Sequence, residues 1–97
     1  MSPGDKLLAL ASLQNERDTV YGANYTRIGQ AMASFFPDGV TLKSPEDFTR
    51  YHLLTMIIAK AGRYAFNFSG EPHTDSLNDL SVYAAILSMV EDERSNK

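Results

Sequence analysis

The sequence contains no cysteine among its 97 residues. This absence excludes disulfide bonds, thiolate zinc sites and cysteine nucleophiles. The chain also has no excess of basic residues, because 12 acidic and 9 basic side chains leave a formal net charge of −3. Proteins that bind the phosphate backbone of nucleic acids usually carry a basic patch, so general DNA or RNA binding is not expected. A small anionic ligand needs only a few local cations and is compatible with this composition.

Long hydrophobic runs are also missing. Residues 1–5 contain no basic region followed by an apolar stretch, so they do not read as a secretory signal. The longest apolar run, 53–59, is much shorter than the roughly 20 residues that cross a bilayer. We therefore expect a cytoplasmic protein with no membrane partner, located in the host cytoplasm if the chain is viral. The 43% apolar and 22% charged residues are typical of a globular protein, and the length predicts one domain over 1–97.

Two segments begin with the same helix-start signal. Ser2-Pro3-Gly4-Asp5 and Ser44-Pro45-Glu46-Asp47 each place serine at the N-cap, proline at the first helical position and an acid in the first turn. The serine oxygen accepts a hydrogen bond from an otherwise unpaired N–H group, and the acid suits the positive end of the helix dipole. These signals predict helices over about 3–21 and 45–66.

Apolar spacing predicts a further helix over about 23–36. Its apolar residues recur at helical intervals on one face, namely Tyr25, Ile28, Met32 and Phe35. Gly29 and Ala33 beside this face would leave room for a close neighbour.

A fourth helix is expected to begin with Thr74 or Asp75 as its cap, and a polar C-terminal tail is expected from about residue 91. Four helices with short connections predict an all-α fold, a small four-helix bundle with antiparallel neighbours. The helix over 45–66 is apolar on most sides, which favours a central position or a subunit interface. A chain of this size buries little surface alone, so we also expect a homo-oligomer.

Charged residues on the third and fourth helices are the main candidates for chemistry. Lys60 and Arg63 lie three residues apart, and Asp75 and Asp79 lie four apart, so each pair shares one helix face. If the two helices run antiparallel, these cations and acids can meet near the connecting loop. One interpretation is an internal salt-bridge network that fixes the helix register. The other is a phosphate site, in which the cations bind phosphate oxygens and the carboxylates orient them or hold Mg²⁺.

Two further groups accompany this cluster. His73 lies near the start of the fourth helix, where backbone N–H groups favour an anion. It can donate a hydrogen bond to a ligand, or it can be a capping or solvent-exposed histidine. The corner between the first two helices can stack on a nucleobase and approach it closely, although such residues also occur in ordinary helix corners. The corner candidates are Tyr21, Gly22, Asn24 and Tyr25.

Taken in order, these motifs resemble a family pattern. Glu16-Arg17-x-x-x-Tyr21-Gly22, Lys60-x-x-Arg63 and His73-x-Asp75-Ser76-x-x-Asp79-x-x-x-Tyr83 resemble small phage-encoded helical proteins, including the nucleotide-modification-associated domain 1 family. These families are in turn similar to the MazG-type all-α nucleoside-triphosphate pyrophosphohydrolases. The resemblance covers about residues 16–91.

The resemblance implies a nucleotide ligand. The MazG-type enzymes hold Mg²⁺ with acid clusters on two helices, whereas here the third helix offers Lys60 and Arg63 where the second acidic pair would be needed. Nucleotide binding is therefore implied more readily than hydrolysis, with no catalytic residue and no cofactor. The first hypothesis is a phage anti-defence "sponge" that sequesters a cyclic oligonucleotide or ADP-ribose-type signal. A Mg²⁺-dependent pyrophosphohydrolase with Asp75 and Asp79 as ligands is the alternative, and a helical protein–protein interaction module is a third hypothesis.

Overall fold

The computed structural model describes residues 2–21 and 24–96, with the side chains of Gln14, residues 16–21 and Asn24 left undescribed. Within these ranges the regular secondary structure is all α-helical and there is no strand, which confirms the all-α fold class. No helix in the described part has the length and apolar character needed to cross a lipid bilayer. The four helices are α1 (Pro3–Tyr21), α2 (Asn24–Phe35), α3 (Pro45–Phe66) and α4 (Thr74–Ser95).

The two predicted helix starts have the same geometry. At α3, Ser44 Oγ accepts a hydrogen bond from the Asp47 N–H at 3.1 Å, and Asp47 Oδ2 accepts from the N–H groups of Ser44 and Lys43 at 3.3 and 3.0 Å. At α1, Ser2 Oγ accepts from the Asp5 N–H at 3.1 Å, and Asp5 Oδ2 accepts from the Ser2 N–H at 3.2 Å. Each helix therefore starts at the predicted serine cap, and the acid adds the reciprocal hydrogen bond of a capping box.

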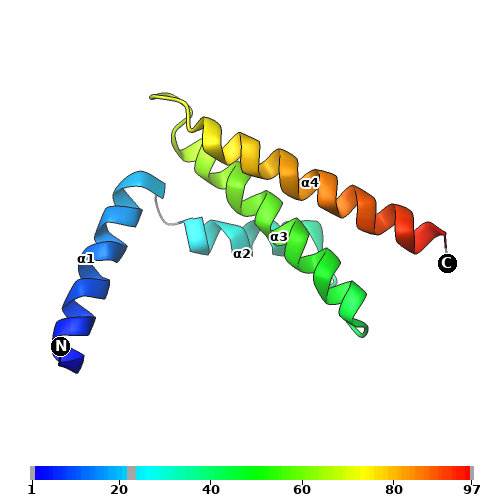
Figure 1. Cartoon of the computed structure of the whole chain (residues 1–97), viewed down its shortest axis with the longest axis horizontal. Coiled ribbons are helices and arrows are strands. Elements are labelled where there is room, and N and C mark those ends of the chain that lie inside the picture. Colours follow the sequence, from blue (N-terminus) through cyan, green and yellow to red (C-terminus); the bar gives the residue numbers. More distant parts are fainter. Residues whose placement is uncertain (1, 22–23, 97) are drawn as a thin grey trace.

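Helix α3 is the centre of the fold. It packs against α4 over most of its length and against α2 on another side (Figure 1). Its start is bonded to the end of α4 and its later half to the beginning of α4, so the two helices form a hairpin. Among the described residues, the buried apolar ones are few, namely Met32, Leu53 and Ala59. Two of the three come from α3, which confirms its predicted central position.

Helix α4 corrects two expectations about its ends. Its N-cap is His73 rather than Thr74 or Asp75, because the His73 carbonyl oxygen already accepts a hydrogen bond from the Ser76 N–H at 3.1 Å. The segment from residue 91, expected as a polar tail, continues the helix to Ser95. Ion pairs from Glu91 to Arg50 and Arg94 hold this last part of α4 in place.

Helix α1 stands apart from the other three helices and projects to one side of them (Figure 1). Every α1 side chain that the structure describes is exposed, including four leucines: Leu7, Leu8, Leu10 and Leu13. Leucine is usually buried in folded proteins, and no described residue of the chain covers these four.

The chain is extended and has a large surface for its mass. Its radius of gyration is 16.6 Å, against about 12.5 Å for a compact domain of the same length. Its accessible surface is 7028 Å², whereas a compact monomer of 10.8 kDa exposes about 5,500 Å². The excess of about 1,500 Å² is surface that a compact fold of this length would cover.

Candidate functional site

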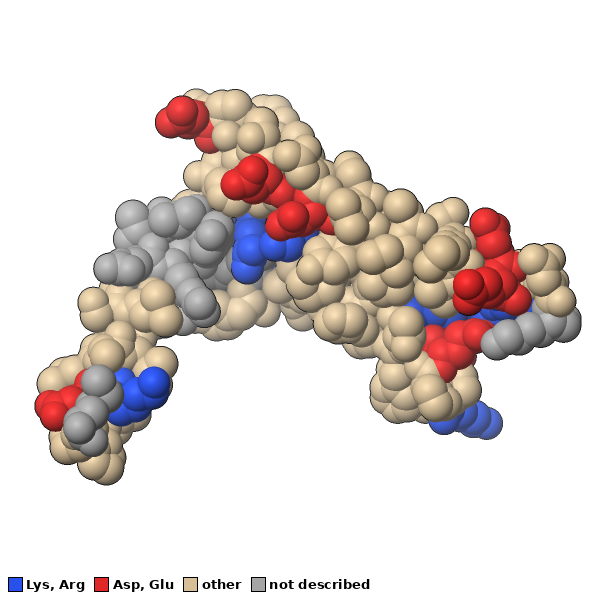
Figure 2. Space-filling view, viewed as in Figure 1, with Lys and Arg blue, Asp and Glu red and all other residues tan. Residues whose placement is uncertain are grey.

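The charged cluster forms at the loop end of the α3–α4 hairpin. Lys60 Nζ lies 3.0 Å from Asp79 Oδ2, so the predicted meeting of these two helices is confirmed for this pair. The two partners differ in exposure, because the Lys60 side chain is only 12% exposed and that of Asp79 is 52% exposed. Figure 2 shows basic and acidic side chains side by side near this end of the hairpin, and a second such group near its other end.

The other predicted residues lie on the same two helices, within about two turns of the paired residues. Arg63 is half-buried one turn after Lys60, in the last turn of α3. Asp75 is exposed in the first turn of α4, one turn before Asp79. His73 is half-buried, and its Nδ1 shares a hydrogen bond of 2.5 Å with Ser76 Oγ.

Ser76 is the most buried residue of the described chain, with 1% exposure. A buried hydroxyl without a partner costs free energy, and the His73 ring supplies that partner. His73 therefore has a structural role at the start of α4. The residue remains partly exposed to solvent.

The predicted corner is only partly described. Gly22 lies outside the described residues, and Tyr21 and Asn24 end and begin helices without a described side chain. Tyr25 is described and is 69% exposed. The residue is therefore largely accessible to solvent, as a stacking residue would need to be.

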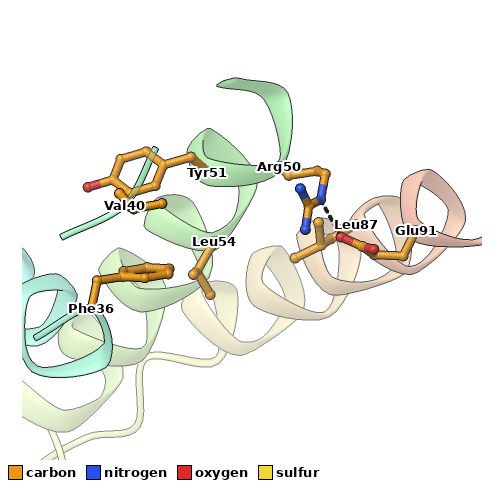
Figure 3. A pocket seen from close by; sticks show the side chains of 7 residues that line it. All are labelled: Phe36, Val40, Arg50, Tyr51, Leu54, Leu87 and Glu91. Carbon is orange, nitrogen blue, oxygen red and sulfur yellow. Dashed lines mark hydrogen bonds and ion pairs between the residues drawn. The ribbon is translucent and has the colours of Figure 1, made fainter. Parts of the chain in front are cut away.

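A second charged group lies at the open end of the hairpin, where α3 begins and α4 ends. The sequence patterns do not predict it. Arg50 Nε lies 2.5 Å from Glu91 Oε1, and Arg50 NH1 lies 3.5 Å from Asp47 Oδ1. This ion pair borders a cavity of about 160 Å³ (Figure 3). The remaining walls are apolar or aromatic: Phe36, Val40, Tyr51, Leu54 and Leu87.

A register argument could have found this group. Arg50 lies ten residues before Lys60, and Glu91 lies twelve residues after Asp79. Once Lys60 is paired with Asp79 in an antiparallel hairpin, residues about three turns away on each helix face each other. The sequence shows this only after the register is known, because neither residue belongs to a recognisable motif.

The ion pairs at the open end shift the pKa values of the participating groups. The hydrogen bond from Arg50, followed by that from Arg94, lowers the pKa of Glu91. The hydrogen bond to Glu91 raises the pKa of Arg50 above its already high value. Hydrogen bonds from the backbone N–H groups of Lys43 and Ser44 lower the pKa of Asp47. All three groups therefore stay charged at neutral pH.

The two ends differ in what they can bind. At the open end, Arg50 is already matched by two carboxylates, and the cavity of about 160 Å³ is smaller than the roughly 300–1,000 Å³ of typical ligand pockets. At the loop end, the mostly buried Lys60 side chain forms an ion pair with the half-exposed carboxylate of Asp79. Among the described residues, no three His, Asp or Glu side chains lie close enough together to hold a metal ion.

No protein-family model matches this chain, and comparisons with curated proteins and with solved structures give no match either.

Proposed function

We propose that the chain is a phage-type protein of the host cytoplasm that binds a nucleotide-derived ligand through its phosphate groups, without cleaving it. The phosphate would bind at the loop end of the α3–α4 hairpin, on Lys60 and Arg63, with Tyr25 available for base stacking. A cyclic oligonucleotide or an ADP-ribose-type immune signal is the proposed ligand class. The resemblance of the ordered motifs to nucleotide-handling phage families supports this choice.

The observation that carries the proposal is the asymmetry of the Lys60–Asp79 ion pair. Lys60 is 12% exposed and needs a negative partner, because a desolvated ammonium group is costly when it is unpaired. Asp79 is 52% exposed, so its carboxylate can turn toward water at little cost. A phosphate oxygen can then replace the carboxylate on the same ammonium group. Arg63, one turn further along α3, offers the bidentate geometry that phosphate favours.

This exchange predicts opposite effects for the two partners. Lys60→Met removes the cation and should abolish nucleotide binding. Asp79→Asn removes the competing carboxylate and should strengthen binding, by about fivefold for each 1 kcal/mol that the displaced ion pair contributes. If Asp79 were instead a Mg²⁺ ligand of a pyrophosphohydrolase, Asp79→Asn would weaken binding and stop turnover.

The experiment is a thermal-shift screen of the full chain against mononucleotides, cyclic dinucleotides and trinucleotides, and ADP-ribose derivatives, with EDTA or Mg²⁺. A ligand that binds the native state raises the apparent stability by mass action. The ligand is then recovered after denaturation, because an intact ligand indicates sequestration and a cleaved one indicates an enzyme. The matched control is Arg50→Met with Glu91→Gln, which removes the other hairpin ion pair and should leave binding unchanged. Absence of a shift with every compound would refute the proposal.

A helical protein–protein interaction module is the second candidate, favoured by the exposed apolar surface. Besides the α1 leucines, Phe48 is 56%, Phe68 is 73% and Met89 is 54% exposed. Exposed apolar residues in such numbers usually mark an interaction surface.

For the quaternary structure we propose a homo-oligomer in which the four helices complete a bundle with antiparallel neighbours. The excess surface of about 1,500 Å² over a compact monomer supports assembly with further copies. A protein that stays monomeric and binds neither a nucleotide nor another protein would contradict both candidate functions.

A further inference from the structure

Helix α1 carries an apolar stripe that none of the residues described in its own chain covers. Leu7, Leu10 and Leu13 recur at intervals of three residues and therefore share one side of the helix. They are 67%, 47% and 41% exposed. Most of the stability of a helix in a protein comes from packing its apolar face. The α1 stripe therefore needs a surface to cover it.

A groove between α2 and α3 offers such a surface. Its volume is about 390 Å³ and its walls are mostly apolar, with Ile28, Met32, Phe36 and Tyr51 among them. Gly29 lies on its α2 side, and a Cβ atom built there would meet no other atom within 4 Å. Gly29 and Ala33 leave room for a close neighbour, and the described part of this chain does not supply one.

The area involved fits a pair of chains. Each chain exposes about 1,500 Å² more than a compact monomer of its mass would. Two copies that cover this excess bury about 3,000 Å² in total, which lies within the 2,000–5,000 Å² typical of obligate homodimers. One helix and one groove per chain are also complementary parts. When α1 of each copy binds in the groove of the other copy, both helices and both grooves are occupied, and the assembly closes as a dimer.

We infer that two copies of this chain exchange their first helices, so that α1 of one copy lies in the α2–α3 groove of the other. The leucine stripe then packs against the open surface at Gly29 and Ala33, and α1 takes the fourth place in each bundle. This inference rests on the homo-oligomer proposed above and is independent of nucleotide binding.

Disulfide trapping tests the exchange, because the natural chain has no cysteine to interfere. Single variants Leu7→Cys, Leu10→Cys and Leu13→Cys are each mixed with an Ala33→Cys chain of different mass and then oxidised. A mixed disulfide dimer from at least one of these pairs is expected. In a chain that carries both cysteines, a disulfide formed only within the chain would mean that α1 covers its own groove and would overturn the inference.

Sedimentation of the full chain tests the dimer itself, and Gly29→Ala tests the groove. A Cβ at Gly29 is harmless in the single chain and favours the helix, but it would intrude on a helix seated in the groove. The dimer dissociation constant should therefore rise about tenfold or more, with unchanged helix content. Gly70→Ala is the control, since its Cβ would meet only the Asn67 carbonyl oxygen at 4.0 Å.

The outcomes separate the two proposals. A monomer at every concentration refutes the homo-oligomer and the exchange together. A dimer without mixed disulfides, or one that Gly29→Ala leaves equally tight, refutes the exchange and leaves the homo-oligomer standing.

Discussion

Removing either partner of the Lys60–Asp79 ion pair should destabilise the fold by different amounts. Asp79→Asn leaves a 12% exposed lysine without its carboxylate. Breaking a fully buried pair costs about 3–5 kcal/mol. Because Lys60 still reaches water in part, we expect about 1–3 kcal/mol here. Lys60→Met leaves Asp79, which is 52% exposed and can be hydrated, so its expected cost is about 0–1 kcal/mol.

The double variant Lys60→Met with Asp79→Asn should lie within about 1 kcal/mol of the natural chain, because it leaves no desolvated charge. Urea denaturation at one fixed protein concentration measures the four free energies of unfolding, and their cycle isolates the coupling between the two residues. Equal costs for the two single variants, or a larger cost for Lys60→Met, would refute the reasoning from exposure. It would also remove the physical basis for phosphate exchange at this pair.

Two other perturbations test the hairpin. Ser44→Ala removes the cap of the central helix α3 and should lower the free energy of unfolding by about 1 kcal/mol, which is roughly 4–8 °C in melting temperature for a chain of this length. Ser2→Ala removes the same cap from the projecting α1 and should cost less. Equal losses of stability would contradict a central role for α3. Because the pKa values of Glu91 and Asp47 are lowered in the fold, their contribution to stability is fully present above their unfolded values of about 4.3 and 3.9. It should be lost as pH falls through the folded values. Melting curves from pH 6 to 2.5 should show this decline, and Glu91→Gln should reduce it.

Local signals in the sequence predict the helices well because they act within a few residues. The repeated Ser-Pro-x-Asp motif places the starts of α1 and α3, and capping hydrogen bonds at both sites confirm it. The end of α4 was less predictable, because its residues are polar and their helical state depends on a distant partner. Glu91 is held by Arg50, 41 positions earlier in the chain, and no local pattern contains that information.

The candidate site was predictable only in part for the same reason. Helical spacing groups Lys60 with Arg63 and Asp75 with Asp79, but only the hairpin register brings Lys60 to Asp79. The exposures of the two side chains depend on tertiary packing and cannot be predicted from local sequence patterns. The exposed α1 could not be predicted at all, since its leucine spacing is the same whether the helix packs on its own chain or on another.

The motif set itself predicts a link between nucleotide binding and assembly. Its first part, Glu16-Arg17-x-x-x-Tyr21-Gly22, lies on and just after α1, whereas Lys60, Arg63 and Asp79 belong to the hairpin. If these parts form one site and α1 is exchanged, each site contains residues of both copies. Nucleotide affinity should then fall when the protein is diluted below the dimer dissociation constant.

By thermodynamic reciprocity, each bound nucleotide must strengthen the dimer by the factor by which dimerisation strengthens nucleotide binding at one site, so that two occupied sites give the square of this factor. Sedimentation with and without saturating nucleotide measures one side of this relation, and titrations at two protein concentrations measure the other. Gly29→Ala should weaken both equilibria, although it lies on α2 and outside the charged cluster. An affinity that stays constant across the monomer–dimer transition would show that a single chain forms the whole site, and α1 would then serve assembly alone.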